Sequence, residues 1–88
     1  MKLIIAIVRD SDSDAVSRAL TSNKFRVTGI ASTGGFLRKG KTTLLIGLED
    51  DQVEQALQII RTSLSPATEP EETRVVIFVL KVDNFDHF

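Results

Sequence analysis

Strand-like and helix-like segments alternate along this chain in an order that few folds share. Four short, apolar and mainly β-branched runs are typical of strands: residues 3–8, 25–31, 42–48 and 74–82. Two other segments, residues 12–22 and 50–63, place their apolar residues on one helical face. The order strand-helix-strand therefore occurs twice, which predicts an α+β, ferredoxin-like βαββαβ sandwich. Right-handed crossovers would put both helices on one face of a four-stranded antiparallel sheet, with the first and third strands in its centre.

The strands of such a sheet would be apolar on both of their faces. Residues 75–80 are apolar without interruption, and residues 3–8 show the same two-sided character. Two helices on one side can cover only one of these faces. A large exposed apolar surface is unusual on a soluble monomer. We therefore expect a second copy of the chain to cover the other face.

The length and composition of the chain limit the classes of protein to which it can belong. A chain of 88 residues predicts a single domain spanning residues 1–88. It contains no cysteine, which excludes disulfides, thiolate metal sites and a cysteine nucleophile. The net charge of −1 gives no support for a nucleic-acid or membrane partner, and the apolar runs are too short to span a bilayer. We expect a cytoplasmic protein.

A glycine-rich loop joins the second and third predicted strands. Gly34 and Gly35 allow close backbone approach, and their N–H groups are suited to cradle a phosphate. Phe36 and Leu37 follow, and then three cations, the last of them Lys41. A phosphate cradle, an aromatic ring and positive charge together favour a nucleotide ligand. The alternative is a plain hairpin loop, in which the glycines make the turn and the aromatic packs on its own domain.

Several stretches of the sequence resemble one known family. They are residues 1–8, 23–28, the loop TGGFLR at 33–38, and 82–88. The chain is similar there to the PII-like cyclic-di-AMP receptors, and the similarity runs from residue 1 to about 63 and again from about 74. The resemblance implies a PII-like homotrimer that binds cyclic-di-AMP in the clefts between its subunits and signals to a downstream protein. It implies no enzymatic activity, no cofactor and no metal.

The resemblance and the glycine-rich loop give ten candidate ligand-binding residues. They are Arg26, Thr28, Gly34, Gly35, Phe36, Leu37, Lys41, Gly47, Phe78 and His87. Two of them depart from the family pattern, since Lys41 stands where asparagine is expected and His87 where a glutamine reads an adenine edge. Residues 65–73 form a much shorter loop than in the known receptors, and an acidic one.

Simpler roles for these residues and other functions for the chain stay open. Arg26 and Thr28 fit an ordinary exposed strand, Phe78 fits a core, and His87 fits chance packing of the tail. A PII-like sensor of a mononucleotide (ATP, ADP or AMP) and a structural trimer are alternatives. So is a small ferredoxin-like enzyme that hydrolyses phosphate esters, although neither a nucleophile nor a general base is evident.

Overall fold

A computed structural model describes residues 1–31, 40–66 and 73–83 of the chain. Its elements follow the predicted order: β1 (Lys2–Arg9), α1 (Asp10–Ser22), β2 (Arg26–Ala31), β3 (Lys41–Leu48), a 3-10 turn (Asp50–Gln52), α2 (Val53–Ser63) and β4 (Val75–Lys81). The βαββαβ order and the α+β class are thus confirmed. The strand boundaries agree with the prediction to within one residue.

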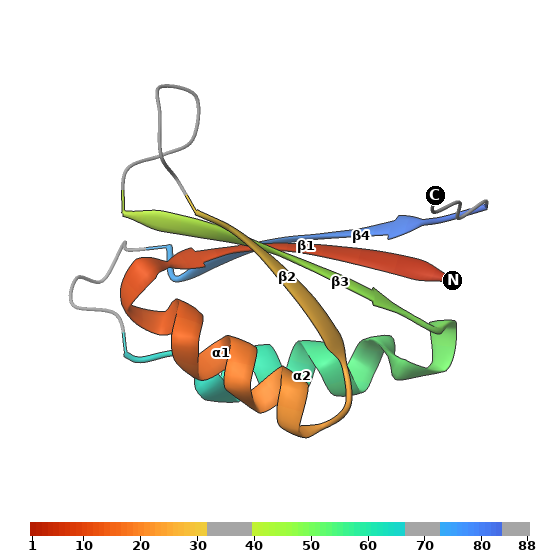
Figure 1. Cartoon of the computed structure of the whole chain (residues 1–88), viewed down its shortest axis with the longest axis horizontal. Coiled ribbons are helices and arrows are strands. Elements are labelled where there is room, and N and C mark those ends of the chain that lie inside the picture. Colours follow the sequence, from red (N-terminus) through yellow and green to blue (C-terminus); the bar gives the residue numbers. More distant parts are fainter. Residues whose placement is uncertain (32–39, 67–72, 84–88) are drawn as a thin grey trace.

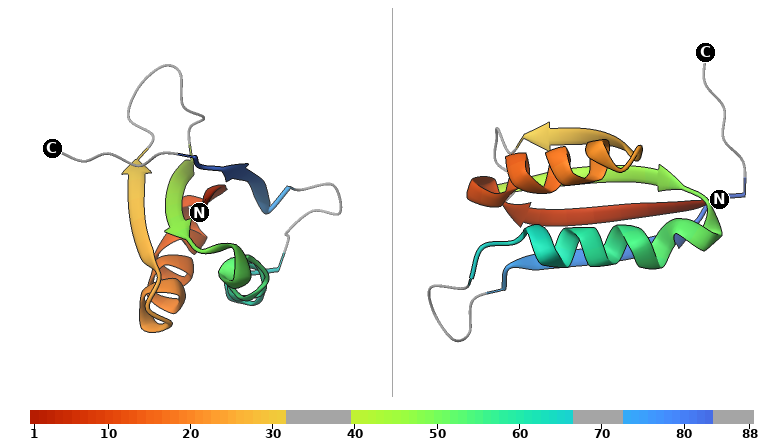
Figure 2. Two further views of the ribbon diagram at one scale, coloured as in Figure 1. Left: turned by 90° about the vertical axis from the view of Figure 1, so that its right-hand side faces the viewer. Right: turned by 90° about the horizontal axis from the view of Figure 1, so that it is seen from below.

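The four strands form one antiparallel sheet in the order β2-β3-β1-β4. The first and third strands are therefore central, as the ferredoxin-like topology requires. Both helices lie side by side beneath one face of this sheet (Figures 1 and 2). No other described element covers the opposite face, which we call the open face.

The hydrophobic core lies between the sheet and the two helices. Alternate residues of the central strands point into it, because successive side chains of a strand face opposite ways. The buried apolar residues are Ile4, Ala6, Val8, Val16, Leu20, Phe25, Leu44, Ile46, Leu48, Ala56 and Ile60. The helical spacing of Val16 with Leu20, and of Ala56 with Ile60, is the pattern from which the two helices were predicted.

The start of α1 differs from the prediction. The sequence favours a helix from residue 12, capped by Asp12 or Ser11, whereas the helix begins at Asp10 and has no side-chain cap. Asp12 is instead 1% exposed and is one of the buried residues of the helix. Its carboxylate contacts Arg9 and Ser65, so it is unavailable as a cap.

The end of α1 differs as well. The position of Asn23 just after residues 12–22 favours a left-handed residue that ends the helix, but its φ is −97°. Lys24 takes that role with a φ of 69°, a conformation that costs most L-residues about 1–2 kcal/mol. The N–H groups of Lys24 and Phe25 donate to the carbonyls of Thr21 and Leu20 at 2.9 and 3.0 Å. These bonds turn the chain tightly from α1 into β2.

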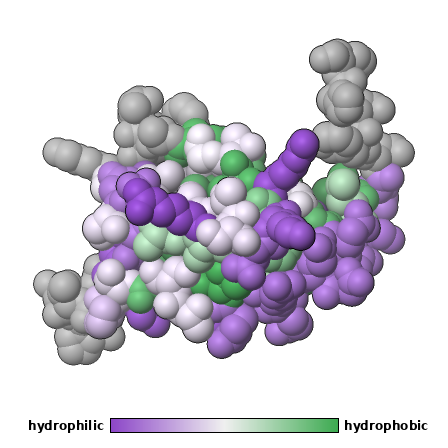
Figure 3. Space-filling view, turned by 60° about the horizontal axis from the view of Figure 1, so that its bottom comes forward, coloured by the Kyte–Doolittle hydropathy of each residue, from purple (hydrophilic) through white to green (hydrophobic). Residues whose placement is uncertain are grey.

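The open face carries apolar side chains that do not belong to the hydrophobic core. In register across the strands, Thr28, Leu45, Ile5 and Phe78 form one row of this face. Exposed apolar side chains of the same face are Ile30, Val76, Phe78 and Leu80. By contrast, hydrophilic residues occupy most of the surface over the helices (Figure 3). The two-sided apolar character of the strands therefore leaves a hydrophobic surface on the open face.

Candidate functional site

A hollow of about 480 Å³ lies at one end of the open face. Its volume falls within the range of about 300–1,000 Å³ that is usual for small-molecule sites. Its lining residues are Met1, Lys2, Leu3, Arg26, Thr28, Leu45, Gly47 and Val82. Three of these, Arg26, Thr28 and Gly47, are candidate ligand-binding residues from the sequence. The fold thus brings together residues from two strands that the sequence separates by the glycine-rich loop.

The register of the sheet explains the shape of the hollow. Gly47 pairs with Arg26 on one side and with Leu3 on the other. Paired residues of neighbouring strands share a face. Gly47, which has no side chain, therefore lies between the side chains of Arg26 and Leu3 on the open face. Thr28 and Leu45 pair in the next row. The hollow therefore has an apolar floor with an arginine and a hydroxyl beside it.

Neither backbone conformation nor packing requires a glycine at position 47. A Cβ built at Gly47 would meet no atom within 4 Å, and its φ lies outside the left-handed region. A glycine in the interior of a strand nevertheless weakens the strand. Within the described residues, the missing side chain leaves free space in the hollow.

Sequence reasoning missed five lining residues of the hollow. They are Met1, Lys2, Leu3, Leu45 and Val82. The sequence identifies Leu3 only as part of a two-sided apolar strand and Leu45 only as part of the strand at residues 42–48. Val82 reaches the hollow because its N–H donates to the Met1 carbonyl at 3.0 Å, a contact between distant parts of the chain.

Two other candidates lie away from the hollow within one chain. Lys41 begins β3 whereas Gly47 lies near its end, so at about 3.3 Å per residue the two are about 20 Å apart. The Nζ of Lys41 donates to the Thr73 carbonyl at 3.4 Å. Phe78 is 51% exposed on β4, three strands from Thr28, or about 14 Å at the usual strand spacing. Its exposure excludes the simple core role within a single chain.

Five candidates fall outside the described residues. They are Gly34, Gly35, Phe36, Leu37 and His87.

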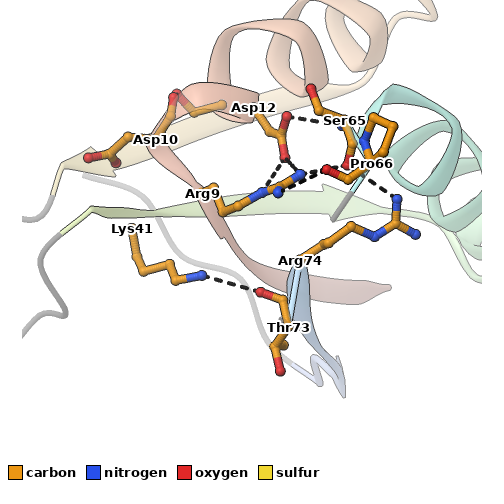
Figure 4. A network of polar contacts seen from close by, with 9 residues as sticks. Arg9, Asp10, Asp12, Lys41, Ser65, Pro66, Thr73 and Arg74 are labelled. Atoms are coloured by element: carbon orange, nitrogen blue, oxygen red, sulfur yellow. Dashed lines mark hydrogen bonds and ion pairs between the residues drawn. The ribbon is translucent and has the colours of Figure 1, made fainter. Parts of the chain in front are cut away.

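A polar cluster lies at the opposite end of β1 from the hollow (Figure 4). The Arg9 guanidinium donates to Asp12 Oδ2 from Nε at 2.9 Å and from Nη2 at 2.6 Å. The same Nη2 donates to the Ser65 carbonyl at 2.6 Å, and the Ser65 N–H donates to Asp12 Oδ1 at 3.1 Å. Arg74 Nη1 also donates to the Ser65 carbonyl, at 3.2 Å. The cluster joins the start of α1 to the end of α2 and the start of β4.

The chemistry of this cluster is structural. Burial alone would raise the pKa of the Asp12 carboxyl, but the hydrogen bonds from Ser65 and Arg9 and the charge of Arg9 outweigh it, so that this pKa lies below its ordinary value of 3.8. Both oxygens of the carboxylate are satisfied, and no buried side-chain polar atom of the described residues lacks a partner. A fully bonded ion pair of this kind holds three elements together.

Asp12→Asn is expected to lower the free energy of unfolding at pH 7 by about 1–3 kcal/mol, the cost of losing charge-assisted hydrogen bonds. Because the pKa of Asp12 is lowered on folding, its contribution is complete above pH 3.8 and is lost as the pH falls through and below that value. Chemical denaturation of both proteins at pH 7 and near pH 3 measures the difference. Asp14→Asn, an exposed change on the same helix, is the control, and equal stability of all three proteins at pH 7 would contradict this role.

The described residues show neither a metal site nor a membrane span. No group of three or more histidine, aspartate or glutamate side chains within residues 1–31, 40–66 and 73–83 is placed to hold a metal ion. None of the helices in this part of the chain is long and apolar enough to cross a membrane.

A ferredoxin-like sheet with a ligand-sized hollow on its open face defines a class of small α+β ligand-binding proteins. Within this class, the family model described as "Cyclic-di-AMP receptor" matches residues 1–69, and the chain belongs to that family. The resemblance seen in the sequence is thereby confirmed. The chain is also similar to the crystal structure of a functionally unknown protein from Pediococcus pentosaceus ATCC 25745. The two are 35% identical over 99% of this chain and 96% of the other, with a TM-score of 0.77.

Proposed function

We propose that this protein is a PII-like sensor that binds cyclic-di-AMP, and that the hollow on the open face is part of its binding site. The observation that carries the proposal is the meeting of Arg26, Thr28 and Gly47 in one hollow, in a member of the cyclic-di-AMP receptor family. We propose that the sensor acts in the cytoplasm on a downstream protein.

The chemistry of the hollow suits a nucleotide. A guanidinium binds a phosphate through directed, charge-assisted hydrogen bonds, which is the role we assign to Arg26. The Thr28 hydroxyl can donate to a phosphate or a ribose oxygen. Leu3 and Leu45 provide an apolar floor for a base or a sugar. The space left by Gly47 lets the ligand approach the sheet.

The distribution of the candidates supports a site between subunits. By the spacing of residues and strands, Lys41 lies about 20 Å from Gly47 and Phe78 about 14 Å from Thr28, and neither lines the hollow. We infer that Lys41 and Phe78 reach the ligand from a second copy of the chain, while Arg26 binds it from the first. A cyclic homotrimer with its open faces turned inward would supply both copies and cover the apolar surface. Gly34, Gly35, Phe36, Leu37 and His87 complete the proposed site.

The residues that line the hollow favour binding over catalysis. Its described lining contains the basic side chain of Arg26 and no carboxylate or histidine. A general base for hydrolysis is therefore missing from this part of the site. We assign the protein a sensor role without cofactor or metal.

Arg26→Gln is expected to weaken cyclic-di-AMP binding about 10- to 150-fold, because charge-assisted hydrogen bonds of about 1.5–3 kcal/mol are lost. Arg18→Gln removes an exposed charge from α1 and is the matched control. Calorimetry against cyclic-di-AMP, cyclic-di-GMP, ATP and AMP measures affinity and selectivity in one series. Tighter binding of ATP or AMP would favour a mononucleotide sensor instead. Release of product from any of these ligands would favour an enzyme.

A further inference from the structure

Asp10, the first residue of α1, is bonded to the start of β3 through both its backbone and its side chain. Its N–H donates to the Gly40 carbonyl at 2.9 Å. Its Oδ1 accepts a hydrogen bond from the Thr42 hydroxyl at 2.5 Å. These two partners stand directly before and directly after Lys41 in the sequence. The chain around Lys41 is therefore held to the helix at two points.

The backbone bond between Asp10 and Gly40 depends on an unusual conformation. Gly40 has a φ of 81°, in the left-handed region that favours glycine. The N–H groups in the first turn of a helix have no acceptor within that helix. The N–H of Asp10 gains one from this turn of the chain. The turn before β3 and the start of α1 thus stabilise each other.

The side-chain bond fixes the direction in which Lys41 points. Thr42 pairs with Val8, which is 0% exposed in the core, so the Thr42 side chain lies on the helix-covered face of the sheet. Successive side chains of a strand face opposite ways, so that of Lys41 lies on the open face. A bond that holds Thr42 on one face therefore orients Lys41 on the other.

The ammonium group of Lys41 has only a weak partner among the contacts described for it. Its Nζ donates to the Thr73 carbonyl at 3.4 Å, beyond the usual limit of about 3.2 Å, and the bond is exposed (Figure 4). Such a bond costs little to exchange for a charged acceptor such as a phosphate. The backbone of Lys41 is thus fixed by Asp10, while its charge is available to a ligand.

On the basis of the proposed function, we infer that Asp10 is a positioning residue for the ligand site. By holding Gly40 and Thr42, it directs Lys41 over the open face, from which Lys41 binds the ligand of a neighbouring copy. The carboxylate of Asp10 is bonded to Thr42 on the helix side of the sheet, so it acts through Lys41 and does not touch the ligand. Fixing the backbone before the ligand arrives lowers the entropy lost on binding.

Calorimetry of Asp10→Ala, Asp10→Asn and Thr42→Val with cyclic-di-AMP tests this inference. Asp10→Ala and Thr42→Val both remove the side-chain hydrogen bond and should bind about three- to tenfold more weakly than the wild type. Asp10→Asn keeps an oxygen that accepts the bond and should restore most of the affinity. Asp14→Ala, which changes an exposed aspartate of the same helix, is the matched control and should bind like the wild type.

A combined variant distinguishes positioning of Lys41 from a general structural role. In a Lys41→Gln protein the positioned charge is already lost, so adding Thr42→Val should weaken binding by less than twofold. A purely structural role predicts the same three- to tenfold loss in both backgrounds, and that result would overturn the inference. Thermal melting of the unliganded variants sets a temperature at which all of them are folded. If Asp10→Ala does not fold, Thr42→Val, which keeps the branched shape of the side chain, still tests the bond.

The outcomes separate this inference from the proposed function. If the wild type does not bind cyclic-di-AMP, the proposed function fails and this inference with it. If the wild type binds and Lys41→Gln binds equally well, the hollow keeps its proposed role, but Asp10 has no ligand contact to position. If Lys41→Gln binds weakly while Asp10→Ala and Thr42→Val bind normally, only the role of Asp10 is overturned.

Discussion

Gly47→Val is expected to abolish measurable cyclic-di-AMP binding while leaving the fold at least as stable as the wild type. The new isopropyl group would occupy the hollow between Arg26 and Leu3, where the ligand is proposed to lie. We expect affinity to fall about 100-fold or more, which corresponds to about 2.8 kcal/mol. The stability should rise by up to about 1 kcal/mol, because valine favours strands and glycine does not. A Cβ at this position meets no atom within 4 Å, so the first atom of the new side chain clashes with nothing.

Gly29→Ala is the matched control for this experiment. Gly29 also lies within a strand, but a Cβ there would contact Leu44 Cδ2 at 3.6 Å, on the core side of the sheet. Its substitution should leave binding unchanged. Titration calorimetry and thermal melting of both variants measure the two effects. Normal binding by Gly47→Val would show that the ligand does not occupy the hollow, and weaker binding together with a lower melting temperature would mean that the strand itself is damaged.

The sequence predicts the fold well because the fold depends on local patterns. Helical spacing identifies both helices, and uninterrupted β-branched runs identify the four strands. The order of these elements then limits the topology to very few choices. Even the open face is foreseen, since the apolar residues of β1 and β4 exceed what one layer of helices can cover.

The candidate site is only partly predictable, because it depends on register. The sequence points to Arg26, Thr28 and Gly47, yet Leu3 and Val82 join them only through the pairing of strands that are far apart in the chain. Asp12 shows the same limit. The residues next to Asp12 in the sequence are typical of a helix cap. Its partner Ser65, however, lies 53 residues away, and no local pattern reveals it. In the hollow and at Asp12, hydrogen bonds between residues far apart in the sequence determine which groups come together.

If the protein forms the proposed trimer, Ile5→Lys is expected to convert it into monomers that keep their secondary structure. Ile5 lies in the middle of the open face, paired with Leu45 and Phe78, and is only partly buried in a single chain. If open faces pack against one another in a trimer, a lysine here would bury an unpaired charge, which strongly destabilises the contact. The core beneath the sheet would be untouched, so the circular dichroism of the variant should remain that of a folded α+β protein. Cyclic-di-AMP binding should fall with the trimer, because the proposed site needs two copies of the chain.

The neighbouring substitution Ile4→Lys separates assembly from folding. Ile4 is 0% exposed and points into the core, so a lysine there should unfold the subunit itself. Light scattering and circular dichroism of the wild type and the two variants then give three distinct results: a folded trimer, a folded monomer and an unfolded chain. A wild-type monomer at micromolar concentration, or an Ile5→Lys variant with the mass of the wild type, would mean that the open face is not the interface. The apolar residues of β1 and β4 would then need another cover, and a ligand site shared between subunits would lose its physical basis.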